Sequence, residues 1–224
     1  MTFKGQFEAI IFDMDGLLVD SETVWEEAEN AALVAHGVTP DPAVRSQLVG
    51  LRNDVFLARM IEIYRMDVSI QVLHDDVIGR MLQLIPRIVK PQPGAREILR
   101  YVAENGIRTA IASNSPTVIV EATVKSQGWE SIFTTRCSAD LVQHGKPAPD
   151  IYLKVADLLG VSPAACLALE DSANGARAAV AAGMTTFAVP DFSHTQLEAF
   201  EGVTPHVYES LHSVLAFLRG ELMT

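Results

Sequence analysis

The sequence predicts an α/β fold in which a doubly wound parallel sheet is interrupted, just after its first strand, by a small all-helical domain. Three observations lead to this prediction. Apolar runs of strand length recur along the chain, segments of helical length alternate with them, and one long N-terminal stretch shows only helical spacing. With 224 residues, 49% of them hydrophobic, the chain can bury the core of one such domain together with an insert.

The expected strands are short apolar runs that end in polar residues. The first covers Phe7 to Asp13, and its apolar residues are continuous instead of alternating, as in a strand that is covered on both faces. Runs of the same type occupy residues 107–113, 166–171 and 185–190. Because helical segments separate these runs, the pattern favours βαβ units and a parallel sheet.

The expected helices of this α/β part alternate with those runs, over residues 94–105, 116–127, 149–159 and 173–182. A glycine lies just beyond the end of each helix: Gly106, Gly128, Gly160 and Gly183. The residue after a helix often adopts a left-handed conformation, which glycine accepts without steric cost. These glycines therefore indicate where the four helices end.

Residues 21–88 contain no strand-like run, and their apolar residues instead recur at the spacing of a helix. Examples are Val24, Ala28, Ala31, Ala32 and Ala35. The segment KPQPGA (90–95) then returns the chain to the α/β pattern. We therefore expect a helical domain over residues 20–89 and an α/β core domain built from residues 1–19 and 90–224.

The composition of the chain limits its partners and its compartment. The formal net charge of −11 repels phosphate backbones and anionic membrane surfaces, so we expect neither nucleic acid nor a membrane as a partner. No run of about 18 apolar residues and no leader-like segment occurs, which favours the cytoplasm. Cys137 and Cys166 match no metal-ligand spacing and are expected to be buried, reduced thiols. A monomer and a small homo-oligomer both stay open.

Polar residues gather where the predicted strands end, and in a parallel α/β sheet ligands bind at that edge. The candidate site residues are Asp13 and Asp15 after the first strand, Ser113 and Asn114 after the second, Glu170 and Asp171 after the third, and Lys146 in a loop before a helix. Each of these clusters alone is common in solvated turns. Because all of them meet at one predicted edge, we interpret them as one site.

The residue types in this predicted site complement one another. Carboxylates are the hard oxygen ligands that hold magnesium, and four of them at one edge would repel one another without a cation. Ser113 and Asn114 lead into a helix N-terminus, where hydroxyl, amide and backbone N–H groups can bind an anion. Lys146 adds a positive charge suited to a phosphate oxygen. The set predicts phosphoryl transfer with magnesium as cofactor.

Four motifs of the sequence together resemble the haloacid dehalogenase superfamily of phosphohydrolases. They are DMDG (13–16), Ser113 with Asn114, Lys146 in GKPAPD (145–150) and EDSANG (170–175), and they follow the order of the family. The resemblance implies that Asp13 is the nucleophile, which forms an aspartyl-phosphate, and that Asp15 is the general acid and base. It also implies that magnesium is held by the Asp13 carboxylate, the Asp15 backbone carbonyl and Asp171. Glu170 would lie close by.

The same resemblance implies that Ser113, Asn114 and Lys146 bind the transferring phosphoryl group. It also implies that Lys146 is a catalytic residue. One branch of the superfamily carries a helical cap domain after the first strand, which matches the helical insert. Within that branch, GLLVDSETVWEEAE (16–29) and VGLRNDV (49–55) are similar to bacterial sugar phosphatases of the 2-deoxyglucose-6-phosphatase or hexitol-phosphatase type. The implied activity is magnesium-dependent hydrolysis of a small phosphorylated metabolite, either a sugar phosphate or a sugar-alcohol phosphate.

Two residues of the predicted cap are further candidates for substrate binding. The hinge turn of the family brings the acidic position Glu22 over the active site. For Arg52, the sequence is equally consistent with an exposed surface charge and with a side chain that contacts the sugar. Residues 16–22 and 89–94 would be the hinges on which the cap moves.

Two alternatives to a sugar phosphatase are weighed. β-Phosphoglucomutases are close relatives that have a histidine where this chain has Trp25, so mutase activity is disfavoured; the helical spacing of Trp25 favours core packing. A phospho-accepting signalling receiver module also combines acidic strand ends and a lysine on a doubly wound sheet. A receiver needs neither a helical insert nor a second carboxylate two residues beyond its nucleophile, and this sequence predicts both.

Overall fold

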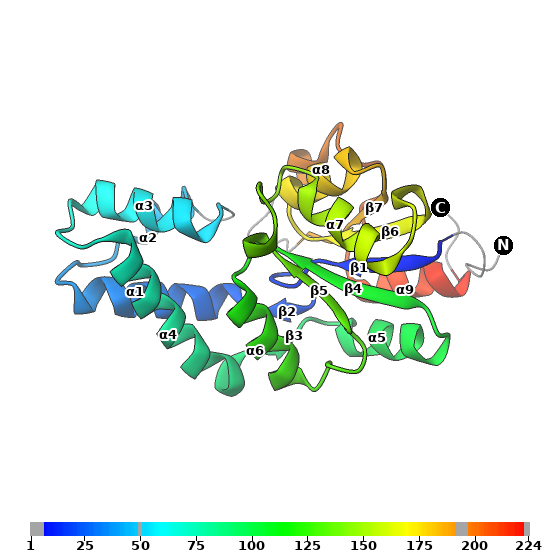
Figure 1. Cartoon of the computed structure of the whole chain (residues 1–224), viewed down its shortest axis with the longest axis horizontal. Coiled ribbons are helices and arrows are strands. Elements are labelled where there is room, and N and C mark those ends of the chain that lie inside the picture. Colours follow the sequence, from blue (N-terminus) through cyan, green and yellow to red (C-terminus); the bar gives the residue numbers. More distant parts are fainter. Residues whose placement is uncertain (1–6, 49–50, 191–196, 222–224) are drawn as a thin grey trace.

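The computed structural model describes residues 7–48, 51–190 and 197–221 (Figure 1). At its centre lies a five-stranded parallel sheet in the order β5-β4-β1-β6-β7. Its strands are β1 (Ala9–Phe12), β4 (Arg108–Ser113), β5 (Thr135–Ser138), β6 (Cys166–Glu170) and β7 (Thr185–Ala188). The first strand of the chain is thus the central one, as in a doubly wound fold.

Helices cover both faces of this sheet (Figure 1). They are α5 (Ala95–Glu104), α6 (Thr117–Gln127) and α9 (Leu211–Arg219) on one face, and α7 (Asp150–Leu159) and α8 (Ala173–Ala181) on the other. Ile10 and Phe12 of β1 share a core cluster with the first group, whereas Ala9 and Ile11 share one with the second. Since successive side chains of a strand point to opposite faces, a strand covered on both sides needs an unbroken apolar run.

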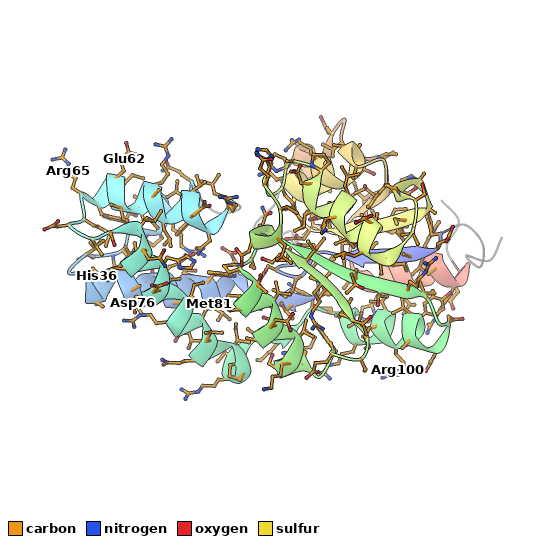
Figure 2. All side chains as sticks on the ribbon, viewed as in Figure 1. His36, Glu62, Arg65, Asp76, Met81 and Arg100 are labelled. Carbon is orange, nitrogen blue, oxygen red and sulfur yellow. The ribbon has the colours of Figure 1, made fainter. Side chains whose placement is uncertain are left out.

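A second lobe, which we call the cap lobe, lies beside the sheet and is helical in its described residues (Figure 1). It consists of α1 (Glu22–Ala35), α2 (Pro42–Ser46), α3 (Asn53–Tyr64) and α4 (Ile70–Ile88). α1 packs against α4, and Ala28 on α1 and Met81 on α4 are fully buried. Figure 2 shows Glu62 and Arg65 on the outer side of this lobe, away from the sheet.

The chain passes between the two lobes at a short antiparallel ladder. β2 (Val19–Asp20) pairs with β3 (Lys90–Pro91). The ladder lies inside both segments that the sequence predicts as hinges, residues 16–22 and 89–94. The division into domains at residues 20 and 89 stays a prediction, as does the hinge role of these segments.

The predicted fold class is confirmed. All four predicted strands and all four predicted core helices are present, with ends within two residues of the prediction. The sequence analysis missed β2, β3, β5, α9 and three short 3₁₀ helices, Ala139–Leu141, Pro163–Ala165 and Leu197–Phe200. Cys137 and Cys166 are buried and free, as expected. Among the described residues, no helix combines the length and the hydrophobicity that crossing a membrane requires.

Candidate active site

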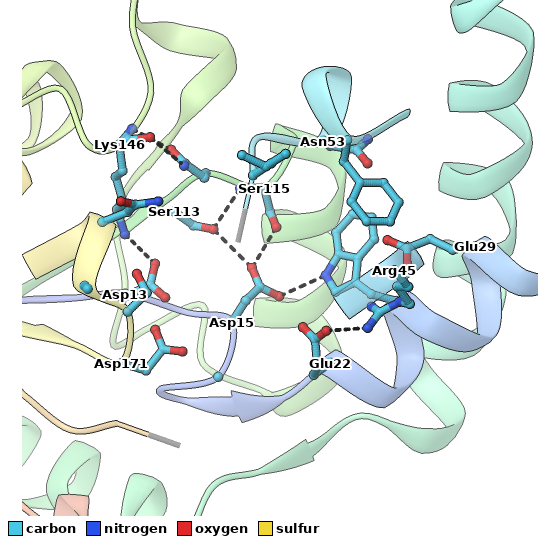
Figure 3. A pocket seen from close by; sticks show the side chains of 18 of the residues that line it. Asp13, Asp15, Glu22, Glu29, Arg45, Asn53, Ser113, Ser115, Lys146 and Asp171 are labelled. Atoms are coloured by element: carbon cyan, nitrogen blue, oxygen red, sulfur yellow. Dashed lines mark hydrogen bonds and ion pairs between the residues drawn. The ribbon is translucent and has the colours of Figure 1, made fainter. Parts of the chain in front are cut away.

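The candidate site forms where β1, β4 and β6 end. Asp13 directly follows β1, Ser113 is the last residue of β4, and Asp171 directly follows β6. Because β4 and β6 both pair with β1, these three ends lie side by side. A cavity of about 410 Å³ opens there, lined by strand-end residues and by residues of the cap lobe (Figure 3). The structure thus brings the predicted strand-end clusters together.

Lys146 is buried beside the cavity between two carboxylates. Its Nζ lies 2.6 Å from Asp13 Oδ1 and 2.5 Å from Glu170 Oε1. Burial lowers the pKa of Lys146, but the charges of Asp13 and Glu170 outweigh burial and raise its pKa above the ordinary value. The hydroxyl of Tyr152 donates to the same Glu170 carboxylate. Lys146 therefore stays protonated and holds the Asp13 carboxylate in place.

Asp13, Glu170 and Asp171 form a carboxylate cluster in which one oxygen of each lies within 4.8 Å of the others. Burial raises the pKa of Asp13 to about 7 against the opposing charge of Lys146. Burial and the charge of Asp13 raise the pKa of Asp171 well above its ordinary value. Carboxylates that share a buried site repel one another unless a cation compensates them. The donor set therefore fits a hard divalent cation such as magnesium.

The carboxylate of Asp15 faces away from that cluster and is held by four donors (Figure 3). Ser21 Oγ and Trp25 Nε1 donate to Asp15 Oδ1 over 2.7 and 3.4 Å. Ser113 Oγ and Ser115 Oγ donate to Asp15 Oδ2 over 3.2 and 2.7 Å. Two of these donors come from β4 and its following loop, and two from the entry to the cap lobe. Asp15 therefore ties the cap lobe to the sheet.

Asn114 lines the cavity, and its side-chain amide fixes the backbone of the lysine loop. Asn114 Oδ1 accepts the Lys146 N–H at 2.9 Å, and Asn114 Nδ2 donates to the Lys146 carbonyl at 3.3 Å. A Cβ at Gly145 would lie 2.8 Å from Asn114 Oδ1, so this close approach requires glycine. The amide therefore positions Lys146, while the predicted contact of Asn114 with a phosphoryl group stays a prediction.

The cap side of the cavity contains a charged triad on α1 and α2. Arg45 Nη1 donates to Glu22 Oε1, and Arg45 Nε donates to Glu29 Oε2, both over 2.7 Å (Figure 3). Arg45 and Glu29 are buried, at 8% and 6% exposure. Burial raises the pKa of Glu29 to about 7, although the charge of Arg45 opposes this shift. Glu22 thus lies in the cavity wall, where the sequence places it, but its partner is a buried arginine.

Two aromatic residues and one amide complete the cap side. Trp25 and Phe56 line the cavity, and Trp25 also packs against the core. Trp25 thus packs against the core, as its spacing favours, and its indole N–H also donates to Asp15. Asn53, at the start of α3, also lines the cavity, and its buried Nδ2 has no hydrogen-bond partner among the residues that the structure describes.

Arg52 does not lie in the cavity wall among the residues that the structure describes. Its guanidinium pairs with Asp54, with Nε 2.7 Å from Asp54 Oδ1. Its Cδ lies 3.3 Å from the position of a Cβ at Gly145, so its side chain lies near the lysine loop of the core. A contact between Arg52 and a substrate stays a prediction.

The sequence analysis missed several residues of the site, namely Glu29, Arg45, Asn53, Ser115 and Tyr152. One signal was available for Glu29, because seven residues separate it from Glu22 on one helix and both therefore share a face. Arg45 carries no such signal, since its partners lie 16 and 23 residues away in the chain.

The chain is similar to several known phosphatases and to solved structures. The chain is 36% identical over 194 residues to hexitol phosphatase B of Escherichia coli strain K12, covering 85% of this chain and 86% of that protein. It is 30% identical over 177 residues to the phosphorylated carbohydrates phosphatase of Thermotoga maritima, covering 79% and 82%. The crystal structure of a CbbY variant from Rhodobacter sphaeroides in complex with xylulose-(1,5)bisphosphate matches with a TM-score of 0.84 and 30% identity, over 92% of this chain and 95% of that chain.

The family itself follows from a match over most of the chain. Residues 7–183 match the haloacid dehalogenase-like hydrolases. This range contains all four motifs on which the predicted resemblance rests, and their residues converge on one cavity. The match is to hydrolases, so the receiver alternative falls away. The prediction is confirmed: the chain is an enzyme that belongs to the haloacid dehalogenase-like hydrolase family.

Proposed function

We propose that this enzyme is a magnesium-dependent phosphatase that hydrolyses small phosphorylated sugars or sugar alcohols through an aspartyl-phosphate on Asp13. The observation that carries the proposal is the pairing of Asp13 with Lys146 in a carboxylate cluster, beside a cavity that polar side chains of the cap lobe also line. A cavity of about 410 Å³ has the size of a site for a small metabolite.

The proposed chemistry divides between Asp13 and Asp15. In the first step, an Asp13 oxygen attacks phosphorus, the bond from phosphorus to the sugar oxygen breaks, and the Asp15 carboxyl gives its proton to that oxygen. In the second step, water attacks the phosphorus of phospho-Asp13, Asp15 takes a proton from the water, and phosphate leaves. The hydroxyls of Ser113 and Ser115 suit both forms of Asp15, because a hydroxyl both donates and accepts hydrogen bonds.

The residues proposed to hold magnesium are Asp13, Asp171 and the backbone carbonyl of Asp15, with Glu170 beside them. When bound, the metal would neutralise negative charge on the transferring phosphoryl group. Lys146 would hold another oxygen of that group, since its ammonium already lies 2.6 Å from Asp13. Ser113 and Asn114 lead into α6, and we propose that they contribute N–H donors to the same group.

The proposed substrate class rests on the relatives and on the cap lobe. The named activities of the two phosphatase relatives concern hexitols and phosphorylated carbohydrates, and the CbbY structure holds a sugar bisphosphate. In this chain, Trp25 contacts the proposed general acid at the place where mutases have a histidine. We therefore propose that the enzyme transfers the phosphoryl group to water and does not transfer it back to a sugar, as a mutase does.

A phosphate-release screen tests this proposal. The substrates are hexose phosphates, hexitol phosphates, nucleotides and a phosphopeptide, each assayed with magnesium and with EDTA. We expect magnesium-dependent release from the first two classes and little from the last two. Asp13→Asn should lose turnover, because an amide is a poor nucleophile. Preferred release from nucleotides, or an active Asp13→Asn enzyme, would contradict the proposal.

A further inference from the structure

The cap side of the cavity is separated from the reacting groups. Figure 3 shows Glu29, Arg45 and Asn53 on the opposite side of Asp15 from Asp13. A phosphoryl group at Asp13 therefore leaves the rest of the substrate to face this side. We call the residues Glu22, Trp25, Glu29, Arg45 and Asn53 the cap subsite.

The charges of the cap subsite leave no cation available for a second anion. Arg45 is the only cation among its members, and it is paired with two carboxylates over 2.7 Å each. The formal charge of the triad is −1 when Glu29 is ionised and zero when Glu29 is protonated. Lys146, the other cation among the described residues of the cavity wall, is likewise shared between two carboxylates. Among the described residues that line the cavity, a phosphate in the cap subsite would thus meet carboxylates without a free positive partner, and Arg52, outside this lining, is paired with Asp54.

The remaining polar groups of the cap subsite suit hydroxyls. A hydroxyl both donates and accepts hydrogen bonds. The Glu22 and Glu29 carboxylates offer acceptor oxygens, and the Asn53 Nδ2 is a buried donor without a partner in the described part of the chain. A buried donor that lacks a partner costs free energy, so a ligand that accepts from it gains that free energy back.

We propose that the cap subsite binds the uncharged, hydroxyl-rich part of the substrate and rejects a second phosphate there, so that the enzyme acts on monophosphates of polyols and sugars and discriminates against bisphosphates. This inference rests on the proposed phosphatase function and names its substrate class more narrowly. Like charges brought together in an enclosed site repel each other strongly, and this repulsion is the proposed cause of the rejection.

The decisive comparison is kcat/KM for a hexitol 6-phosphate and for the matching hexitol 1,6-bisphosphate. We expect the wild-type enzyme to prefer the monophosphate by at least about tenfold, since a like-charge contact penalises only the bisphosphate. Equal kcat/KM values would contradict the proposed role of the cap subsite but would leave the proposed phosphatase function standing. Absence of phosphate release from every sugar and polyol monophosphate would instead overturn the proposed function.

Two variants test whether the triad causes this preference. Glu22→Gln and Glu29→Gln each remove one negative charge and release one side of Arg45, so the preference should shrink by at least about fivefold. Glu62→Gln is the matched control, because Glu62 is exposed on the outer face of α3 and the change in net charge is the same. Circular dichroism first establishes which variants fold. An unchanged preference in a folded Glu22→Gln or Glu29→Gln enzyme would contradict the inference.

Asn53→Leu tests independently whether the cap subsite forms hydrogen bonds with the hydroxyls of the substrate. The variant keeps the approximate volume of the side chain and removes the donor. We expect kcat/KM for the hexitol monophosphate to fall by about fivefold, because the variant loses one hydrogen bond to the substrate. Hydrolysis of an aryl phosphate, which has no hydroxyls to accept from Asn53, should change little. Equal losses on both substrates would exclude a hydroxyl contact.

Discussion

Glu170 is a fully buried carboxylate that neighbouring hydroxyls and one ammonium group hold in place. It accepts from the Tyr152 hydroxyl, pairs with Lys146 and accepts from Ser172 Oγ at 3.4 Å. Burial raises the pKa of Tyr152 well above its ordinary value, so its hydroxyl stays protonated and keeps donating. Tyr152 thus fixes Glu170, which in turn fixes Lys146 against Asp13.

Removing that hydroxyl should destabilise the fold. We expect Tyr152→Phe to lower the free energy of unfolding by about 1 to 3 kcal/mol, the usual cost of leaving a buried charged acceptor short of a donor. Tyr208→Phe is the matched control, since the Tyr208 ring packs against Phe187 and its hydroxyl makes no hydrogen bond within the described residues. Urea unfolding of both variants measures the difference. Equal losses would show that the hydroxyl of Tyr152 is not what holds Glu170.

Individual residues also show which contacts of the site can be predicted from the sequence and which cannot. Asp13, Ser113 and Asp171 could be predicted to meet, because strands of a parallel sheet end at one edge whatever their order in the chain. Arg45 could not, because its contact with Glu22 and Glu29 depends on how α2 packs against α1. No periodic pattern in the sequence specifies that packing.

Among the helices and strands, α8 begins in unusually close contact with the site. Its N-cap Ser172 accepts the Gly175 N–H at 3.1 Å. A Cβ at Gly175 would lie 2.1 Å from the Glu170 carboxylate, a separation that atoms cannot adopt. The glycine in EDSANG therefore lets the first turn of α8 approach the carboxylate cluster.

Two glycine-to-alanine substitutions distinguish the gain in helix propensity from the steric collision with Glu170. Gly79→Ala in α4 should stabilise the protein by about 0.5 to 1 kcal/mol, because a Cβ there meets nothing within 4 Å and alanine favours a helix. Gly175→Ala should instead destabilise the protein and reduce phosphate release, because Glu170 must move. Thermal unfolding and the phosphate assay measure both effects. A Gly175→Ala protein as stable and active as Gly79→Ala would contradict the predicted collision.

The sequence predicted the strands that are buried on both faces better than the edge strand and the two-residue strands, for a physical reason. β1 and β6 are buried on both faces and therefore read as unbroken apolar runs. β5, with the sequence TRCS, is a half-buried edge strand of four residues and contains Arg136, so it resembles a loop. β2 and β3 have two residues each, which is too short for any periodicity. Their pairing depends on where the cap lobe leaves and rejoins the sheet.

For the whole molecule, the carboxylate cluster couples stability to pH. The pKa of Asp13 rises from its ordinary value of 3.8 to about 7 on folding without metal, and the pKa of Asp171 also rises. An acid with a higher pKa in the folded state binds more protons when folded than when unfolded. Its contribution to the free energy of unfolding is therefore lost as pH rises from about 4 through about 7. In the metal-free protein this loss is the cost of burying these carboxylates, to which the repulsion between them adds.

Magnesium should reverse that loss, because a cation that binds only the folded state stabilises it and competes with protons for the same oxygens. We expect added magnesium to raise Tm more at about pH 8 than at about pH 5, where Asp13 and Asp171 retain protons in the folded state. Asp171→Asn should abolish most of the increase and should itself raise the metal-free Tm at the higher pH, since it removes one of the mutually repelling carboxylates. Differential scanning calorimetry of both proteins, with and without magnesium, measures these shifts independently of activity. An increase in Tm that is the same at both pH values and survives Asp171→Asn would place the metal elsewhere, because competition with these protons is what makes the stabilisation depend on pH.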